Sequence, residues 1–206
     1  YLTTSYNATS LPTGWHHCTL TFDGRYSRLY IDGILEVTGD AGANYPVIYH
    51  ELNHTLIGAE ASSGSASGGN HFNGKLDEVR IWNTARTQAE IQDNIDNAHT
   101  GYEPDLVGYW QFNDREGNTL ADGVNFNDGT LIDMETSGLY SDWFVSDVPF
   151  NEPIDTPVYD DVAGNCLEFD GSLDDIFINT SDIPAGRAAT FSAWVKTTAS
   201  GDNCIL

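Results

Sequence analysis

The densest group of oxygen-bearing side chains in this chain lies between Asp122 and Gly129. Within that segment Asn125, Asn127 and Asp128 follow Asp122 at short spacing, and its glycines permit a tight wrap of the backbone. Carboxylate and amide oxygens are the ligands that calcium prefers. The segment is therefore a candidate calcium loop. The alternative, a turn in which each Asp or Asn bonds its own backbone, is equally compatible with the pattern.

A second motif, His50 to His54, reads H-E-x-x-H and could hold zinc if it lay on a helix. Pro46 and Asn53 favour a turn, and the apolar residues after His54 favour a strand. On a strand, His50 and His54 would be about 13 Å apart, too far for one zinc. We interpret the motif as a polar loop that leads into a strand.

Paired carboxyl groups could act as glycosidase residues, but adjacent residues of a strand point to opposite faces. This argument applies to three pairs: Asp77 and Glu78, Asp160 and Asp161, and Asp174 and Asp175. The chain has no G-x-S-x-G nucleophile elbow and no phosphate-binding glycine loop. The sequence therefore nominates no catalytic residue, and we expect a protein that is not an enzyme.

Composition limits the class of protein and of partner. The 206 residues are 40% hydrophobic, enough for the core of one domain. The 20 glycines favour many turns between short strands, so we expect an all-β fold. The net charge of −23 disfavours nucleic acid and anionic membranes as partners and favours cations. Three cysteines, Cys18, Cys166 and Cys204, match no zinc spacing, and we expect them to be buried, with one disulfide pair as the alternative. No apolar run is long enough to predict a membrane span.

Local patterns place the expected elements. Residues 15–38 alternate apolar and polar side chains across two Asp-Gly turns and predict a β hairpin. Residues 72–82 predict another strand. Thr87 and Glu90 then form a capping box that begins a short helix near 87–98.

These segments resemble a known family. Trp15-His-His-Cys-Thr-Leu-Thr-Phe-Asp-Gly24 and Leu29-Tyr-Ile-Asp-Gly33 are similar to the hairpin of laminin-G-like and pentraxin-like domains, and the strand and helix of 72–91 also resemble that family. Residues 101–143 look like the closing segment of such domains in large bacterial surface proteins with tandem repeats. The resemblance implies a concanavalin-type β-sandwich jelly roll.

The resemblance also implies a function and a site. It suggests a non-catalytic structural and adhesive repeat at the cell surface, stabilised by calcium, with adjacent repeats, glycans or cell-surface ligands as partners. The alternative is a carbohydrate-binding module attached to a secreted enzyme. The calcium ligands that it nominates are Asp77, Asp122, Asn125, Asn127, Asp128 and Asp170. Loop aromatics that could stack on a sugar are Tyr45, Tyr49, Tyr102, Tyr140 and Trp143.

The segments occur in an unexpected order. Residues 162–206 resemble the beginning of a laminin-G-like domain, whereas residues 1–148 resemble its middle and end. The proline-rich stretch at 149–161 reads as a connector between repeats. Either the domain is circularly permuted, or the chain is a window of a tandem array. We favour the array, in which residues 162–206 complete the following repeat.

Overall fold

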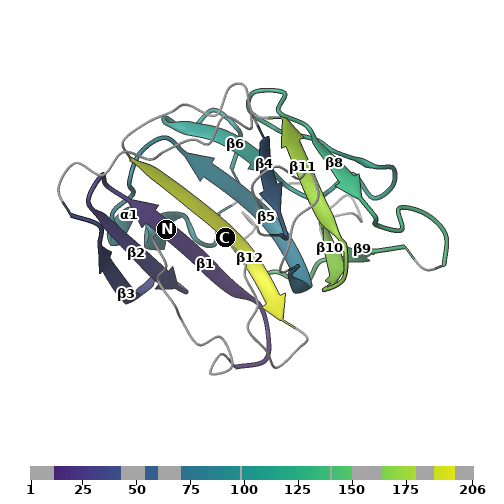
Figure 1. Ribbon diagram of the computed structural model, residues 1–206, viewed down its shortest axis with the longest axis horizontal. Helices are drawn as coiled ribbons and strands as arrows, with labels where there is room; N and C mark the ends of the chain where they lie inside the picture. The colour runs from purple at the N-terminus through teal and green to yellow at the C-terminus, as the bar shows by residue number, and fades with distance from the viewer. Residues whose placement is uncertain are drawn as a thin grey trace, which may run out of the picture.

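The computed structural model describes seven stretches of the chain, which form a two-layer β sandwich with one short helix (Figure 1). The described residues are 12–42, 54–59, 71–97, 99–139, 141–149, 164–179 and 188–197. Two antiparallel sheets face each other, so the predicted all-β sandwich is confirmed.

The larger sheet, sheet A, has eight strands in the order β3-β2-β1-β12-β5-β10-β9, with β6 also paired to β5. Its strands are β1 (His16–Phe22), β2 (Tyr26–Ile31), β3 (Ile34–Asp40), β5 (Asn73–Trp82), β6 (Leu106–Trp110), β9 (Trp143–Val145), β10 (Asn165–Asp170) and β12 (Ala189–Thr197). One end of β5 pairs with β10 and the other end with β6.

The smaller sheet, sheet B, has the order β4-β11-β8-β7. Its strands are β4 (His54–Ile57), β7 (Thr119–Leu120), β8 (Gly129–Ile132) and β11 (Asp175–Asn179). Ile176 and Ile178 of β11 are fully buried against residues of sheet A such as Leu167 and Val195. The apolar core thus lies between the two sheets, as burial of one face of each sheet requires.

The strands β1, β2 and β3 form the hairpin region expected from the Asp-Gly turns. At the second turn, Asp32 and Gly33 both have positive φ values, 48° and 73°. This is the backbone form that tight hairpin turns need. The Asp32 carboxylate also accepts from the backbone amide of His17 at 2.9 Å, which fastens the turn to β1.

The helix α1 (Gln88–Asn94) is shorter than the predicted range of 87–98. Thr87 caps it, and the reciprocal bonds between Thr87 and Glu90 confirm the capping box. The side chains of Gln88 and Gln92 each donate to the carbonyl oxygen of Gly33 at 2.9 Å. The helix is therefore tied to the turn between β2 and β3, on the outer face of sheet A.

A β-bulge changes the direction of side chains within β5. Asp77 lies opposite Trp194 of β12 and Arg80 lies opposite Ser192, with a register shift between them. Glu78, at the bulge, has a positive φ of 54° and contacts Arg80. Asp77 and Glu78 consequently share the outer face of sheet A. The expectation that these neighbours point to opposite faces is wrong, because the extra residue breaks the alternation.

The C-terminal segment completes the sheet within this chain. The strand β12 lies between β1 and β5, and β10 pairs with the other side of β5 (Figure 1). An exchange of these strands between neighbouring repeats would use the same pairings. The choice between a permuted domain and a repeat array therefore stays a prediction, and most of the proposed connector at 149–161 lies outside the described residues.

Three further expectations concern the cysteines, the H-E-x-x-H motif and membrane-spanning segments. Cys18 and Cys166 are buried free thiols, and burial raises the pKa of each to about 12; Cys204 lies outside the described residues. His54 begins a strand as expected, whereas His50 is not among the described residues. In the described part of the chain, no helix has the length and apolar character needed to cross a membrane.

Candidate functional site

The loop from Asp122 to Asp128 folds around the carboxylate of Asp122. Asp122 Oδ1 accepts from the backbone amides of Tyr109 at 2.9 Å and Val124 at 3.0 Å. Its Oδ2 accepts from the amides of Asn125 at 3.0 Å and Asn127 at 3.1 Å. Asp122 is buried, and these amides replace the water that it loses on folding. The turn alternative left open by the sequence describes Asp122 well.

The other predicted residues of this loop join the same network. Asp128 Oδ1 accepts from the amide of Asp122 at 2.9 Å, and the Asn125 side chain donates to the carbonyl of Val107 at 3.0 Å. The Asn127 carbonyl accepts from the indole of Trp110 at 3.1 Å. Four of the six nominated residues are therefore brought together, and they anchor the loop to β6.

The two remaining candidates, Asp77 and Asp170, have different surroundings. Asp77 is buried on β5, where Ser146 donates to it, and burial raises its pKa to about 8. Asp170 ends β10 and accepts from the amide of Ser172 at 2.7 Å. Neither side chain hydrogen-bonds to the 122–128 loop. Among the residues that the structure describes, no three His, Cys, Asp or Glu side chains form a group that could hold a metal ion.

Two aromatic side chains project from adjacent loops beside this network. Phe126 has a positive φ of 60° and is 92% exposed, and Tyr102 is 91% exposed. Their loops meet at Gly101, where an added Cβ would lie 2.5 Å from the carbonyl oxygen of Gly123. We call Tyr102 and Phe126 the aromatic pair. Exposed apolar side chains that gather on neighbouring loops are candidates for a contact surface.

The loop that carries Tyr102 is also held by a carboxylate. Glu103 accepts from the amide and hydroxyl of Thr100 at 2.8 and 3.1 Å, and from the amide of Gly101 at 3.0 Å. The sequence had identified Tyr102 as a loop aromatic but had not identified Phe126. Trp143 is half-buried on β9, and Tyr45, Tyr49 and Tyr140 lie outside the described residues.

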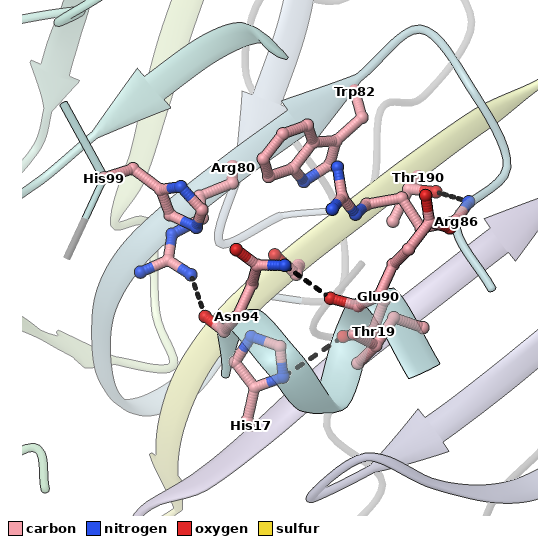
Figure 2. Close-up of a pocket in the computed structure, with 11 residues that line it drawn as sticks. His17, Thr19, Arg80, Trp82, Arg86, Glu90, Asn94, His99 and Thr190 are labelled. Carbon is pink, nitrogen blue, oxygen red and sulfur yellow. Dashed lines mark hydrogen bonds between the residues drawn. The ribbon is translucent and has the colours of Figure 1, made fainter. Parts of the chain in front are cut away.

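A polar chamber that the sequence did not predict lies between α1 and the outer face of sheet A (Figure 2). Strands β1, β5 and β12 supply one wall, and α1 and His99 supply the others. The residues that line it are His17, Thr19, Arg80, Trp82, Arg86, Glu90, Ile91, Asn94, His99, Thr190 and Ser192. Its walls come from segments distant in the sequence, so no local motif could reveal it.

One of the lining residues, Arg80, belongs to a buried ion pair. Arg80 donates to Glu78 at 2.8 Å, and the hydroxyl of Tyr109 donates to the same carboxylate oxygen at 2.5 Å. Both charged side chains are almost completely buried, and burial raises the pKa of Glu78. Burial, with a further contribution from the Arg80 charge, lowers the pKa of His17 to about 3 and that of His99 to about 4. Both imidazoles are therefore neutral at pH 7.

The first part of the chain is similar to a known protein family. Residues 2–92 match the family model Laminin_G_3, described as the concanavalin A-like lectin/glucanases superfamily. Together with the two-sheet architecture, this match shows a concanavalin A-like laminin G fold.

Pappalysin-1 from Mus musculus is 29% identical over 88 residues, and pappalysin-1 from Homo sapiens is 28% identical over 94 residues. These alignments cover 42% and 44% of this chain but only 5% of each relative. The similarity is thus confined to one segment of a much longer protein. No solved structure gives a significant match.

Proposed function

We propose that this domain is a non-catalytic extracellular module that serves as a structural and adhesive repeat of a large surface protein. The aromatic pair carries this proposal, because Tyr102 and Phe126 are more than nine-tenths exposed on loops that touch. Covering one such side chain contributes about 1.5–3 kcal/mol. Since the Asp122 and Glu103 networks already fix both loops, little loop entropy is lost on binding.

The proposed partner is an adjacent repeat or another surface ligand. The laminin G-like fold and the segment similarity to pappalysin-1 support an extracellular setting. The net charge of −23 supports partners that are neutral or cationic rather than nucleic acid or an anionic membrane. Contact through the aromatic pair would leave the sandwich core unchanged.

Removing the aromatic pair should weaken adhesion without unfolding the domain. Beads coated with the wild-type chain should cluster, and beads coated with the double variant Tyr102→Ala/Phe126→Ala should cluster at least 10-fold less, on the order expected for two contact residues. Leu139→Ala is the matched control, since Leu139 is 99% exposed on a different loop. Equal clustering by the wild type and the double variant would contradict the proposal. Circular dichroism checks that each variant is folded.

A carbohydrate-binding module is the second candidate function, favoured by the exposure of Tyr102 and Phe126, because sugar rings stack on accessible aromatic faces. A glycan array with the same three proteins separates the two candidates. A saturable glycan signal that the double variant loses, in the absence of bead clustering, would establish the lectin function in place of the adhesive one.

We also propose that calcium stabilises the module through Asn125 and Asp128, two exposed residues of the loop from Asp122 to Asp128, which we call the oxygen-rich loop. Calcium at millimolar concentration should raise the melting temperature by about 2–4 °C relative to chelator, the shift expected when a ligand binds only the folded state. Asp128→Asn should reduce this shift. A melting temperature that is the same in calcium and in chelator would exclude a stabilising site.

A further inference from the structure

The chamber beneath α1 contains buried nitrogen atoms without hydrogen-bond partners. They are His17 Nε2, Arg80 Nε, Arg86 Nε and His99 Nε2, and all four side chains line the chamber. Leaving a buried polar atom unpaired destabilises the folded state, because the atom loses its hydrogen bonds to water. Four side chains that carry such atoms line one hollow, which favours an occupant that forms hydrogen bonds with some of them.

The hollow sets the size of the occupant. Its free space is about 20 Å³, which is enough for one water molecule and too small for an organic ligand. The side chains around it are closely packed, with His99 against both Trp82 and Tyr109 at ring distances of 5.2 and 5.9 Å. Figure 2 shows Glu90 and Asn94 reaching the chamber from α1, and Arg80 and Trp82 reaching it from β5.

The walls require an occupant that both accepts and donates. Arg80 Nε carries a hydrogen and can only donate. His99 Nδ1 lies 3.4 Å from a carboxylate oxygen of Glu103, so we assign the ring proton to Nδ1, which leaves Nε2 as an acceptor. A halide ion could accept from Arg80 but could not donate to His99. Arg80 and Arg86 would attract an anion, but the carboxylate of Glu90, which also lines the chamber, offsets part of that attraction.

We propose that the chamber binds one water molecule, which accepts from Arg80 Nε and donates to His99 Nε2. The water would then join β5 to the segment that follows α1. The Arg80 guanidinium already donates to the carbonyl of Asn94 at 3.4 Å and to that of Asn97 at 3.2 Å. Arg80 and the water together would hold the C-terminal end of α1 against sheet A.

Oxygen-17 magnetic relaxation dispersion tests this site by counting long-lived water molecules. Ser192→Val, which adds a methyl group to the wall of the chamber, should lower the dispersion amplitude by about one water. Thr38→Val is the control, because Thr38 is an exposed hydroxyl residue of sheet A that does not line the chamber. This control should leave the amplitude unchanged.

Three results would overturn the proposal. One is an equal dispersion amplitude in the wild type and in folded Ser192→Val. The second is anomalous density for bromide in the chamber of crystals grown with bromide, because the occupant would then be an anion. The third applies to the wild type alone: no magnetisation transfer between water and the ring protons of His99. The magnetisation-transfer measurement tests the water site even if Ser192→Val does not fold.

Discussion

Replacing Arg80 with methionine should lower the free energy of unfolding by about 3–5 kcal/mol, the cost of breaking a buried ion pair by removing one partner. Arg80 is 2% exposed, and its loss would leave the Glu78 carboxylate buried with Tyr109 as its remaining hydrogen-bond donor among the described contacts. The carbonyls of Asn94 and Asn97 would lose a donor as well. Urea unfolding monitored by tryptophan fluorescence measures the change.

A surface ion pair supplies the control for this prediction. Arg28 donates to Asp23 at 2.7 Å, and both side chains are partly exposed. Arg28→Met should therefore cost less than about 1 kcal/mol. The double variant Glu78→Leu/Arg80→Met should recover part of the stability lost in Arg80→Met, because no unpaired charge remains. A double variant that is less stable than both single variants would contradict this interpretation.

Asp77→Asn should remove a large part of the pH dependence of stability. Burial, with repulsion from Glu78, raises the folded-state pKa of Asp77 from 3.8 to about 8, although the Ser146 hydrogen bond acts in the opposite direction. The folded protein thus binds a proton that the unfolded chain has released. The stabilisation that this bound proton gives the folded state is fully present below about pH 4. It is lost as the pH rises to about 8, which lowers the free energy of unfolding by roughly 2–5 kcal/mol.

The measurement is urea unfolding of the wild type and Asp77→Asn at intervals across this pH range. The difference in stability between them should change steadily in favour of the variant as the pH rises. Comparing the two proteins cancels the opposite effect of His17 and His99, whose lowered pKa values make stability fall as the pH drops below about 6.5. Asp40→Asn is a control at an exposed carboxylate whose pKa is lowered to about 2. A constant difference between the wild type and Asp77→Asn would contradict the assignment.

The elements that the sequence predicted correctly depend on contacts between near neighbours. The Asp32-Gly33 turn and the capping box of Thr87 and Glu90 are each complete within a few residues. Alternation in residues 15–38 also predicted the strands β1 and β2, whose apolar residues Cys18 and Ile31 lie in the core. The fold class followed from these local patterns.

The candidate site was harder to predict because its geometry depends on non-local contacts. The positive φ of Glu78 has no local signal in the sequence, yet it places two adjacent carboxyl groups on one face. The oxygen-rich loop was found, but the sequence could not show that Asp122 would accept from the amide of Tyr109 on β6. The exposure of Phe126 likewise follows from this anchored loop rather than from its own neighbours in the chain.

The position of β12 has a consequence for how the protein folds during synthesis. The strands β3, β2 and β1 are joined to β5 and its neighbours through β12, which is the last described strand to leave the ribosome. Until then β1 and β5 both have an open edge that can pair with another chain. Because loop closure must precede this long-range pairing, we expect slow folding and a need for protection from aggregation in the nascent chain.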